Sequence, residues 1–169
     1  VTAQQNALGF RTSYAYDALG RQIGVETPLG FRSTTVYDAA GQTWATIDTI
    51  NNRTTMTYNG VGSVETVMNP LGFVSTSVYA ANSNQLAASV DPLGNRISYV
   101  YDLVGQQTEV ENALGNRITT IYDAAGRQIV LMNELGHATT TSYDANGQAV
   151  TVLDANGWLK THTYDAVGQ

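Results

Sequence analysis

The chain has 169 residues, a formal net charge of −6 and only 13% charged residues. This acidic balance argues against nucleic-acid binding, which needs clustered Lys and Arg, and no apolar run in the sequence reaches the length of a membrane span. The sequence contains no cysteine, which excludes a disulfide framework and a cysteine-based site.

A Tyr-Asp pair recurs along the whole chain. The step between successive tyrosines is 21 residues, except for one step of 22 between Tyr79 and Tyr101. A glycine follows the tyrosine by four residues in seven of the eight units. Self-similarity at this period predicts a repeat architecture. The repeated residues are Tyr16, Asp17, Gly20, Tyr37, Asp38, Gly41, Tyr58, Gly62, Tyr79, Tyr101, Asp102, Gly105, Tyr122, Asp123, Gly126, Tyr143, Asp144, Gly147, Tyr164, Asp165 and Gly168.

Each unit contains two turns and two runs typical of strands. A turn of the form Asn/Asp-x-Leu-Gly comes first, and its second position holds all three prolines of the chain, Pro28, Pro70 and Pro92. A β-branched and aromatic run such as residues 95–101 follows, then the Asp-x-x-Gly turn, and then a return strand such as residues 106–111. Asp and Gly suit a hairpin turn, because Asp can accept backbone N–H groups and Gly can adopt positive φ.

A four-residue Asp-x-x-Gly loop would place Tyr101 opposite Gln106, Tyr99 opposite Thr108, and Ile118 opposite Leu131. This pairing predicts a sheet with one apolar face and one mostly polar face that carries the arginines and a Thr/Ser column. Tyrosines of successive units would lie about 9.6 Å apart, so each should pack on the intervening return strand. The apolar face would collect Val25, Val67, Val110, Leu131 and Val152, with Phe10, Phe31, Phe73 and Trp158 at the strand starts.

The repeated unit resembles that of the YD-repeat or RHS-repeat family, which is roughly G-x-x-x-R-Y-x-Y-D-x-x-G-R-L, and the resemblance covers all eight units. It implies an all-β fold in which tandem hairpins form a continuous spiral sheet, a hollow shell or tube. In that family, long arrays are often followed by a core segment and a variable toxin. We therefore expect residues 1–169 to be a single repeat array, a window of a longer or polymerised one.

The fourth unit departs from the pattern. Residues 79–85 lack both the Asp and the Gly and hold the extra residue. They form either a longer exposed loop, used for contact or for a change in curvature, or a turn whose sequence has drifted. We favour the drifted turn. His137 and His162 stand where other units carry different residues, so both are interpreted as repeat variation.

The aspartate column is the best candidate for a ligand site. A row of carboxylates at one turn edge could bind Ca²⁺, but each carboxylate could equally cap its own turn. Asn59 and Ala80 in the same position favour capping. No nucleophile–base arrangement, phosphate loop or zinc set is present. We therefore predict no catalytic, cofactor or metal residues and a protein that is not an enzyme.

Three functions remain open. The first is a structural module that forms an extracellular tube or filament, with copies of itself or flanking repeats joined head to tail, because the chain spans a whole number of repeats. The second is part of the shell of a large RHS-type secreted toxin or adhesin that encloses a peptide cargo. The third is a glycan- or protein-binding module that uses Trp44, Trp158 and Phe73. All three place the protein outside a cell or on its surface, most simply in bacteria.

Overall fold

The computed structural model describes residues 2–165 and 168. These residues form sixteen β-strands and no helix, which confirms the all-β prediction. With no helix among them, the described residues offer no helical segment that could cross a membrane. The chain divides into two compact units: the first runs to residue 86 and includes 90–94, and the second holds 87–89 and the chain from 95 onward.

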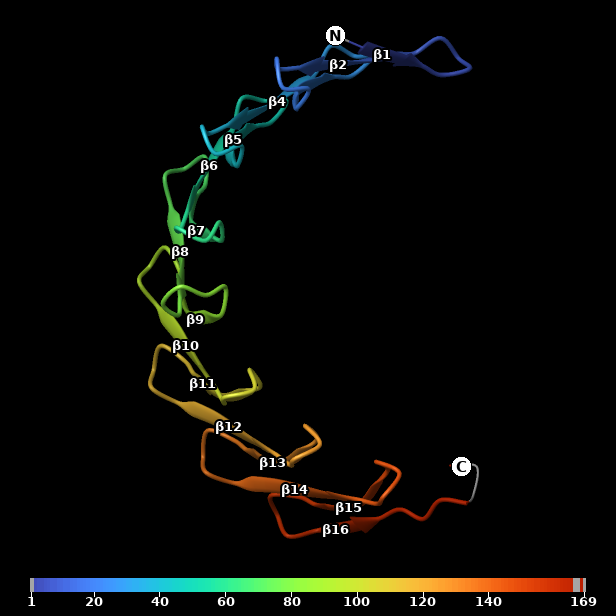
Figure 1. Ribbon diagram of the computed structural model, residues 1–169, viewed down its shortest axis with the longest axis vertical. Coiled ribbons are helices and arrows are strands. Elements are labelled where there is room, and N and C mark those ends of the chain that lie inside the picture. The colour runs from blue at the N-terminus through green and yellow to red at the C-terminus, as the bar shows by residue number, and fades with distance from the viewer. Residues whose placement is uncertain (1, 166–167, 169) are drawn as a thin grey trace. The chain divides into compact units, whose positions relative to one another are not determined.

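The strands are short and evenly spaced (Figure 1). In the first unit they are β1 (Thr2–Gln5), β2 (Arg11–Tyr16), β3 (Gln22–Glu26), β4 (Arg32–Tyr37), β5 (Thr43–Ile47), β6 (Arg53–Tyr58), β7 (Val64–Met68) and β8 (Val74–Tyr79). Residues of β9 (Leu86–Val90) belong to both units. In the second unit they are β10 (Arg96–Tyr101), β11 (Gln107–Glu111), β12 (Arg117–Tyr122), β13 (Gln128–Met132), β14 (Ala138–Tyr143), β15 (Ala149–Leu153) and β16 (Leu159–Thr161).

Within each unit every strand pairs antiparallel with the next one along the chain, so strand order follows sequence order. The two kinds of turn therefore lie at opposite edges of the sheet. We call one the leucine edge, formed by turns 6–9, 27–30, 48–51, 69–72 and 91–94 of the first unit and 112–115, 133–136 and 154–157 of the second. We call the other the aspartate edge, formed by turns 17–20, 38–41, 59–62 and 80–84 of the first unit and 102–105, 123–126 and 144–147 of the second.

Turns at both edges share one geometry. At the aspartate edge, the Gly20 N–H donates to the Asp17 carbonyl at 3.1 Å and the Asp17 N–H donates to the Arg21 carbonyl at 2.9 Å. Gly20 has φ +79°, and this left-handed residue after a type I turn closes a three-residue hairpin loop. Asn51 replaces the glycine with φ 67°, as expected for the side chain that best tolerates this region.

The predicted strand pairing is wrong by one residue next to the loop and by two residues further along the strands. The first shift arises because the loop has three residues rather than four. Tyr99 lies opposite Val110 rather than Thr108, and Tyr101 lies opposite Gln107 rather than Gln106. Leu131 lies opposite Thr120 rather than Ile118. A β-bulge beside the tyrosine adds a second one-residue shift. Two shifts restore the alternation, so the residues predicted to share the tyrosine face still share it.

The described residues form a single layer with almost no interior. Their buried apolar side chains are Ala45 and Ala88, and no large side chain among them is fully buried. Val25, Val67 and Val110 on the tyrosine face are only half-buried. Ala45 pairs with Val36 and so lies on the face opposite the tyrosines. The prediction that the tyrosine face is the buried one is therefore not confirmed, since the described residues supply no second layer to cover it.

Candidate functional site

The repeated tyrosines join each hairpin to the one before it. The Tyr58 hydroxyl donates to the carbonyl oxygen of Thr43, at the start of the preceding return strand, at 2.8 Å. This confirms that the tyrosine packs on the intervening strand. The same bond, fifteen residues back in every case, joins Tyr37 to Gln22, Tyr79 to Val64, Tyr122 to Gln107, Tyr143 to Gln128 and Tyr164 to Ala149, at 2.8–3.1 Å.

The aspartates of the repeat cap their own turns. Asp17 Oδ1 accepts the backbone N–H groups of Leu19 and Arg21, each at 2.9 Å. The Arg21 N–H, together with its guanidinium, lowers the pKa of Asp17, and burial opposes this shift. The amide oxygen of Asn59 accepts the equivalent pair of N–H groups. In the other turns too, the backbone N–H four residues after the aspartate donates to its Oδ1, as at Asp38, Asp102, Asp123 and Asp144.

Turn capping uses the oxygen that a metal ion would need. At both edges the capping Oδ1 is occupied by backbone N–H groups, as at Asp48 and Asn112 of the leucine edge. Across residues 2–165 and 168, no three His, Cys, Asp or Glu side chains are grouped so that they could hold a metal ion. Calcium binding by the aspartate column stays a prediction that the geometry does not favour.

At the aspartate edge, the residue after the turn glycine reaches the next turn, which the sequence reasoning missed. Arg127 binds Asp123 at 2.7 Å, places its guanidinium 4.7 Å from the ring centre of Tyr143, and donates Nη1 to the Asp144 carbonyl at 3.2 Å. Arg21 likewise binds Asp17 and lies over the Tyr37 ring. The signal in the sequence is that this position always holds Arg, Gln or Ser.

Shorter side chains at this position make the same kind of link. The amide groups of glutamines donate to the glycine carbonyl of the following turn, and a serine hydroxyl meets an asparagine. The aspartate edge is therefore a ladder of turn-to-turn contacts within each unit. These links join Gln42 to Gly62, Ser63 to Asn84, Gln106 to Gly126 and Gln148 to Gly168.

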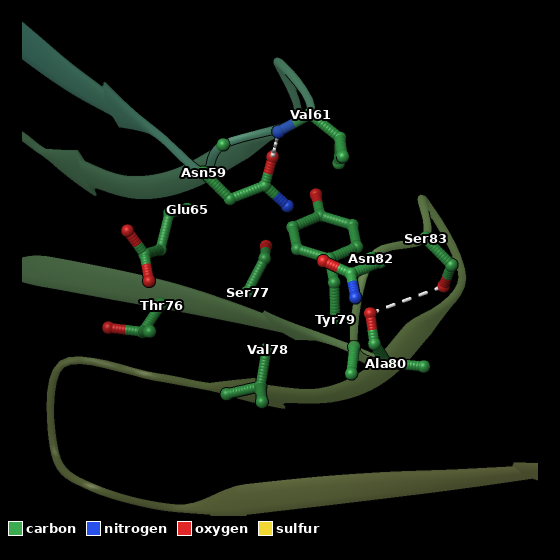
Figure 2. Close-up of a pocket in the computed structure, with 12 residues that line it drawn as sticks. Asn59, Val61, Glu65, Thr76, Ser77, Val78, Tyr79, Ala80, Asn82 and Ser83 are labelled. Atoms are coloured by element: carbon green, nitrogen blue, oxygen red, sulfur yellow. Dashed lines mark hydrogen bonds between the residues drawn. The ribbon is translucent and has the colours of Figure 1, made fainter.

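The irregular fourth turn lines a shallow hollow with Asn59, Glu65 and Tyr79 (Figure 2). The Ala80 N–H donates to the Gln85 carbonyl, and the hydroxyl of Ser83 accepts the Gln85 N–H at 3.1 Å. Asn82, with φ 54°, takes the left-handed position of the glycine. The turn thus rebuilds the usual cap from other side chains, which supports the interpretation as a drifted turn.

The residues considered for glycan contact are separated. Trp44 lies beside the aspartate edge and stacks with the Arg53 guanidinium at 4.6 Å, whereas Phe73 follows a turn of the leucine edge. Trp158 lies in the other unit and is exposed. His162 stacks near Tyr164, with ring centres 6.4 Å apart. The structure brings no aromatic pair of this set together in the first unit.

Comparisons with known proteins agree with the repeat geometry. Residues 143–169 match the family model described as RHS Repeat. No curated protein matches the chain. The fold resembles the crystal structure of TcdB2-TccC3-TEV, with TM-score 0.65 and 16% identity over 99% of this chain and 12% of that one. It also resembles the crystal structure of TcdB2-TccC3-Cdc42, with TM-score 0.60 and 15% identity over 98% of this chain and 11% of that one.

The chain therefore spans about an eighth of the chain of TcdB2-TccC3-TEV, with 12% coverage, and the likeness at 16% identity concerns the fold. The match to the family model covers the last units of the array, where Tyr143, Asp144 and Gly147 follow the same pattern as the earlier units. The resemblance seen in the sequence is confirmed at residues 143–169, which match the RHS Repeat model, and the all-β hairpin fold of the array is similar to that of the TcdB2-TccC3 structures.

Proposed function

We propose that this chain is a wall segment of the shell of an RHS-type secreted or cell-surface bacterial protein. The observation that most supports this proposal is that the repeated side chains of each hairpin bond to the neighbouring hairpin rather than forming a core or a pocket. The tyrosine hydroxyls and the residue after the aspartate-edge glycine bond to the neighbouring hairpin. Such contacts build sheet area, which is what a wall requires.

The single layer fits the same role. A wall has one face toward its contents and one toward the outside, and a sheet without a second layer leaves both faces free. The structural likeness to TcdB2-TccC3 complexes supports a shell rather than an isolated domain. In this role the protein would do no chemistry itself, and a peptide cargo inside the shell would be its partner.

A filament made by head-to-tail continuation is the second candidate. The contacts between one hairpin and the next are the same along each unit, so a further copy could extend the sheet by the same bonds. A repeated heterologous contact that does not close on itself produces a filament. This candidate differs from the first only in what supplies the neighbouring repeats.

Negative-stain electron microscopy of the purified chain, over a dilution series, separates these candidates. Closed particles or curved sheet fragments support the wall segment. Uniform long filaments or tubes that persist on dilution contradict it and favour the filament. Isolated particles that bind a glycan array would contradict both and return attention to Trp44, Phe73 and Trp158.

A further inference from the structure

A row of large apolar side chains projects from the leucine edge of the first unit. Leu8, Leu29, Ile50, Leu71 and Leu93 occupy the third turn position and are 71–84% exposed. Phe10, Phe31 and Phe73 follow two residues after Leu8, Leu29 and Leu71 and are about half exposed, at 50–53%. A side chain left in water contributes little to its own hairpin. The recurrence of these exposed side chains therefore indicates that they contact a surface that lies outside the unit.

The aspartate edge of the same unit lacks such a row. Its third turn positions hold Leu19, Ala40, Val61 and Asn82, so its large exposed side chains are only Leu19 and Val61. The second unit repeats the leucine pattern at Leu114 and Leu135, which are 86% and 79% exposed. Exposed large apolar side chains at turns are therefore more numerous at the leucine edge of the first unit, whereas in the second unit the aspartate edge also exposes Leu103 and Val104.

We propose that the leucine edge of the first unit docks against the same edge of a second copy of this chain, with the two rows antiparallel. In this arrangement the turn at 27–30 of one copy faces the turn at 48–51 of the other. Both rows repeat every two strands, about 9.6 Å, so each of the four turns from 6–9 to 69–72 can face a turn of the other copy, and the turn at 91–94 extends beyond them. The contact is isologous and closes as a dimer.

The available area is close to what a stable dimer requires. A large apolar side chain buries roughly 100 Å² when it leaves water, so the seven side chains at or beside the four facing turns offer on the order of 700 Å² per copy. A standard interface buries about 800 Å² per partner. The patch also exceeds the roughly 300–600 Å² that a monomer usually exposes.

Charge permits this contact and disfavours most others. The turns at 6–9, 27–30, 48–51 and 69–72 carry one charged residue, Asp48, whose carboxylate is bound by Asn52 at 2.9 Å. The chain as a whole has a net charge of −6, which weakens association of two copies through any surface and so favours a contact with little local charge. Arg11, Arg32 and Arg53 flank the row at the strand starts and form a solvated rim.

Sedimentation velocity of the 169-residue chain tests the proposal directly. We expect a concentration-dependent dimer whose dissociation constant rises at least about a hundredfold in the double variant Leu29→Lys with Leu71→Lys. Both side chains contact water in the free chain, so circular dichroism should show that the fold is retained. The matched control is Leu19→Lys with Leu103→Lys at the aspartate edge, which should leave the dimer unchanged.

Cysteine cross-linking gives a second measurement, since the natural chain has no cysteine. A mixture of Pro28→Cys and Thr49→Cys proteins should form a disulfide between copies under mild oxidation. Ala18→Cys mixed with Ala39→Cys, at the other edge, should not.

Three results would overturn the proposal: a chain that stays monomeric at high concentration, association that the leucine-edge variant leaves intact, or association that the control variant abolishes. The proposal goes beyond the wall-segment function and does not rest on it. Filaments that persist in the leucine-edge variant would contradict both ideas, whereas curved sheets without cross-links would contradict this one alone.

Discussion

At the scale of single residues, the tyrosine hydroxyl explains why the repeat uses tyrosine rather than phenylalanine. The ring covers the return strand, and Oη binds a backbone carbonyl of that strand, as Tyr58 does at Thr43. A carbonyl left without this donor would lose a bond at a partly buried position. The hydroxyl thus links neighbouring hairpins and also gives the ring a polar end.

Replacing Tyr58 by Phe should lower the free energy of unfolding by about 1 kcal/mol, because the Thr43 carbonyl loses its donor. Urea denaturation followed by circular dichroism measures this. Tyr14→Phe is the control, since its hydroxyl meets only the exposed Gln4 side chain at 3.3 Å, and we expect less than about 0.5 kcal/mol there. Equal losses at both positions would contradict the role given to the hydroxyl.

Acid should destabilise the chain through its turn caps. Asp17 and Asp123 have a lowered pKa chiefly because the backbone N–H groups of Arg21 and Arg127 bind them, and Asp48 chiefly because the Asn52 side chain does. The folded state therefore holds its protons less tightly than the unfolded state. The stabilisation is complete above the ordinary pKa of 3.8 and is lost as pH falls through the lower folded values.

Unfolding in urea at a series of pH values from about 6 to about 2.5 measures this loss. The triple variant Asp17→Asn, Asp48→Asn, Asp123→Asn keeps an oxygen acceptor, as Asn59 does in its own turn, and should show a weaker dependence below about pH 4. A variant that loses stability with acid as steeply as the natural chain would show that other groups are responsible.

At the scale of elements, the turns decide how closely successive hairpins approach. Gly20 and Gly126 share φ +79°, but a Cβ on Gly20 would meet nothing within 4 Å, whereas one on Gly126 would lie 2.9 Å from the Gln106 Nε2. That nitrogen donates to the Gly126 carbonyl. The second glycine is therefore required both by its own conformation and by the neighbouring turn.

Gly20→Ala should cost about 1 kcal/mol from left-handed strain alone. Gly126→Ala should cost about 1 kcal/mol more, because Gln106 must give up its bond to the turn. Gly20→Asn should cost less than Gly20→Ala, as Asn51 shows by adopting φ 67°. Differential scanning calorimetry of the three variants checks the order, and equal losses for both alanine variants would contradict the turn-to-turn link.

At the scale of the whole molecule, stability comes from nearest-neighbour contacts. Each hairpin bonds only to the hairpins beside it, and the described residues provide no common interior. Such arrays behave as sums of unit and interface contributions. Damage to one strand should therefore stay local, and a surface that covers the exposed leucines should stabilise several hairpins together.

Thr120→Pro, in the middle of β12, should cost about 3 kcal/mol and remove hydrogen-exchange protection in β11 and β13, while β15 remains protected. Ala113→Pro is the control, because proline already occupies this turn position at Pro28, Pro70 and Pro92. Its effect should stay within about 0.5 kcal/mol. Loss of protection over all strands of the unit would show a cooperative domain instead.

The sequence by itself determined the repeat, its turns and the residues that share a face. These follow from local chemistry: Asp and Gly at the first and fourth positions of a segment favour a turn, and alternation along a strand needs no knowledge of its partner. The capping role of the aspartates was predicted for the same reason, since Asp17 binds N–H groups of its own turn.

Only the tertiary structure decided the pairing, because a three-residue loop and a bulge shift it by two residues without changing the pattern of faces. It also decided the acceptor of each tyrosine, which lies fifteen residues earlier, and the reach of Arg127 to Asp144 in the next turn. These contacts join residues of neighbouring hairpins, and their geometry depends on how the two hairpins lie side by side. The same holds for the leucine edge, whose exposure appears only once every hairpin is in its place.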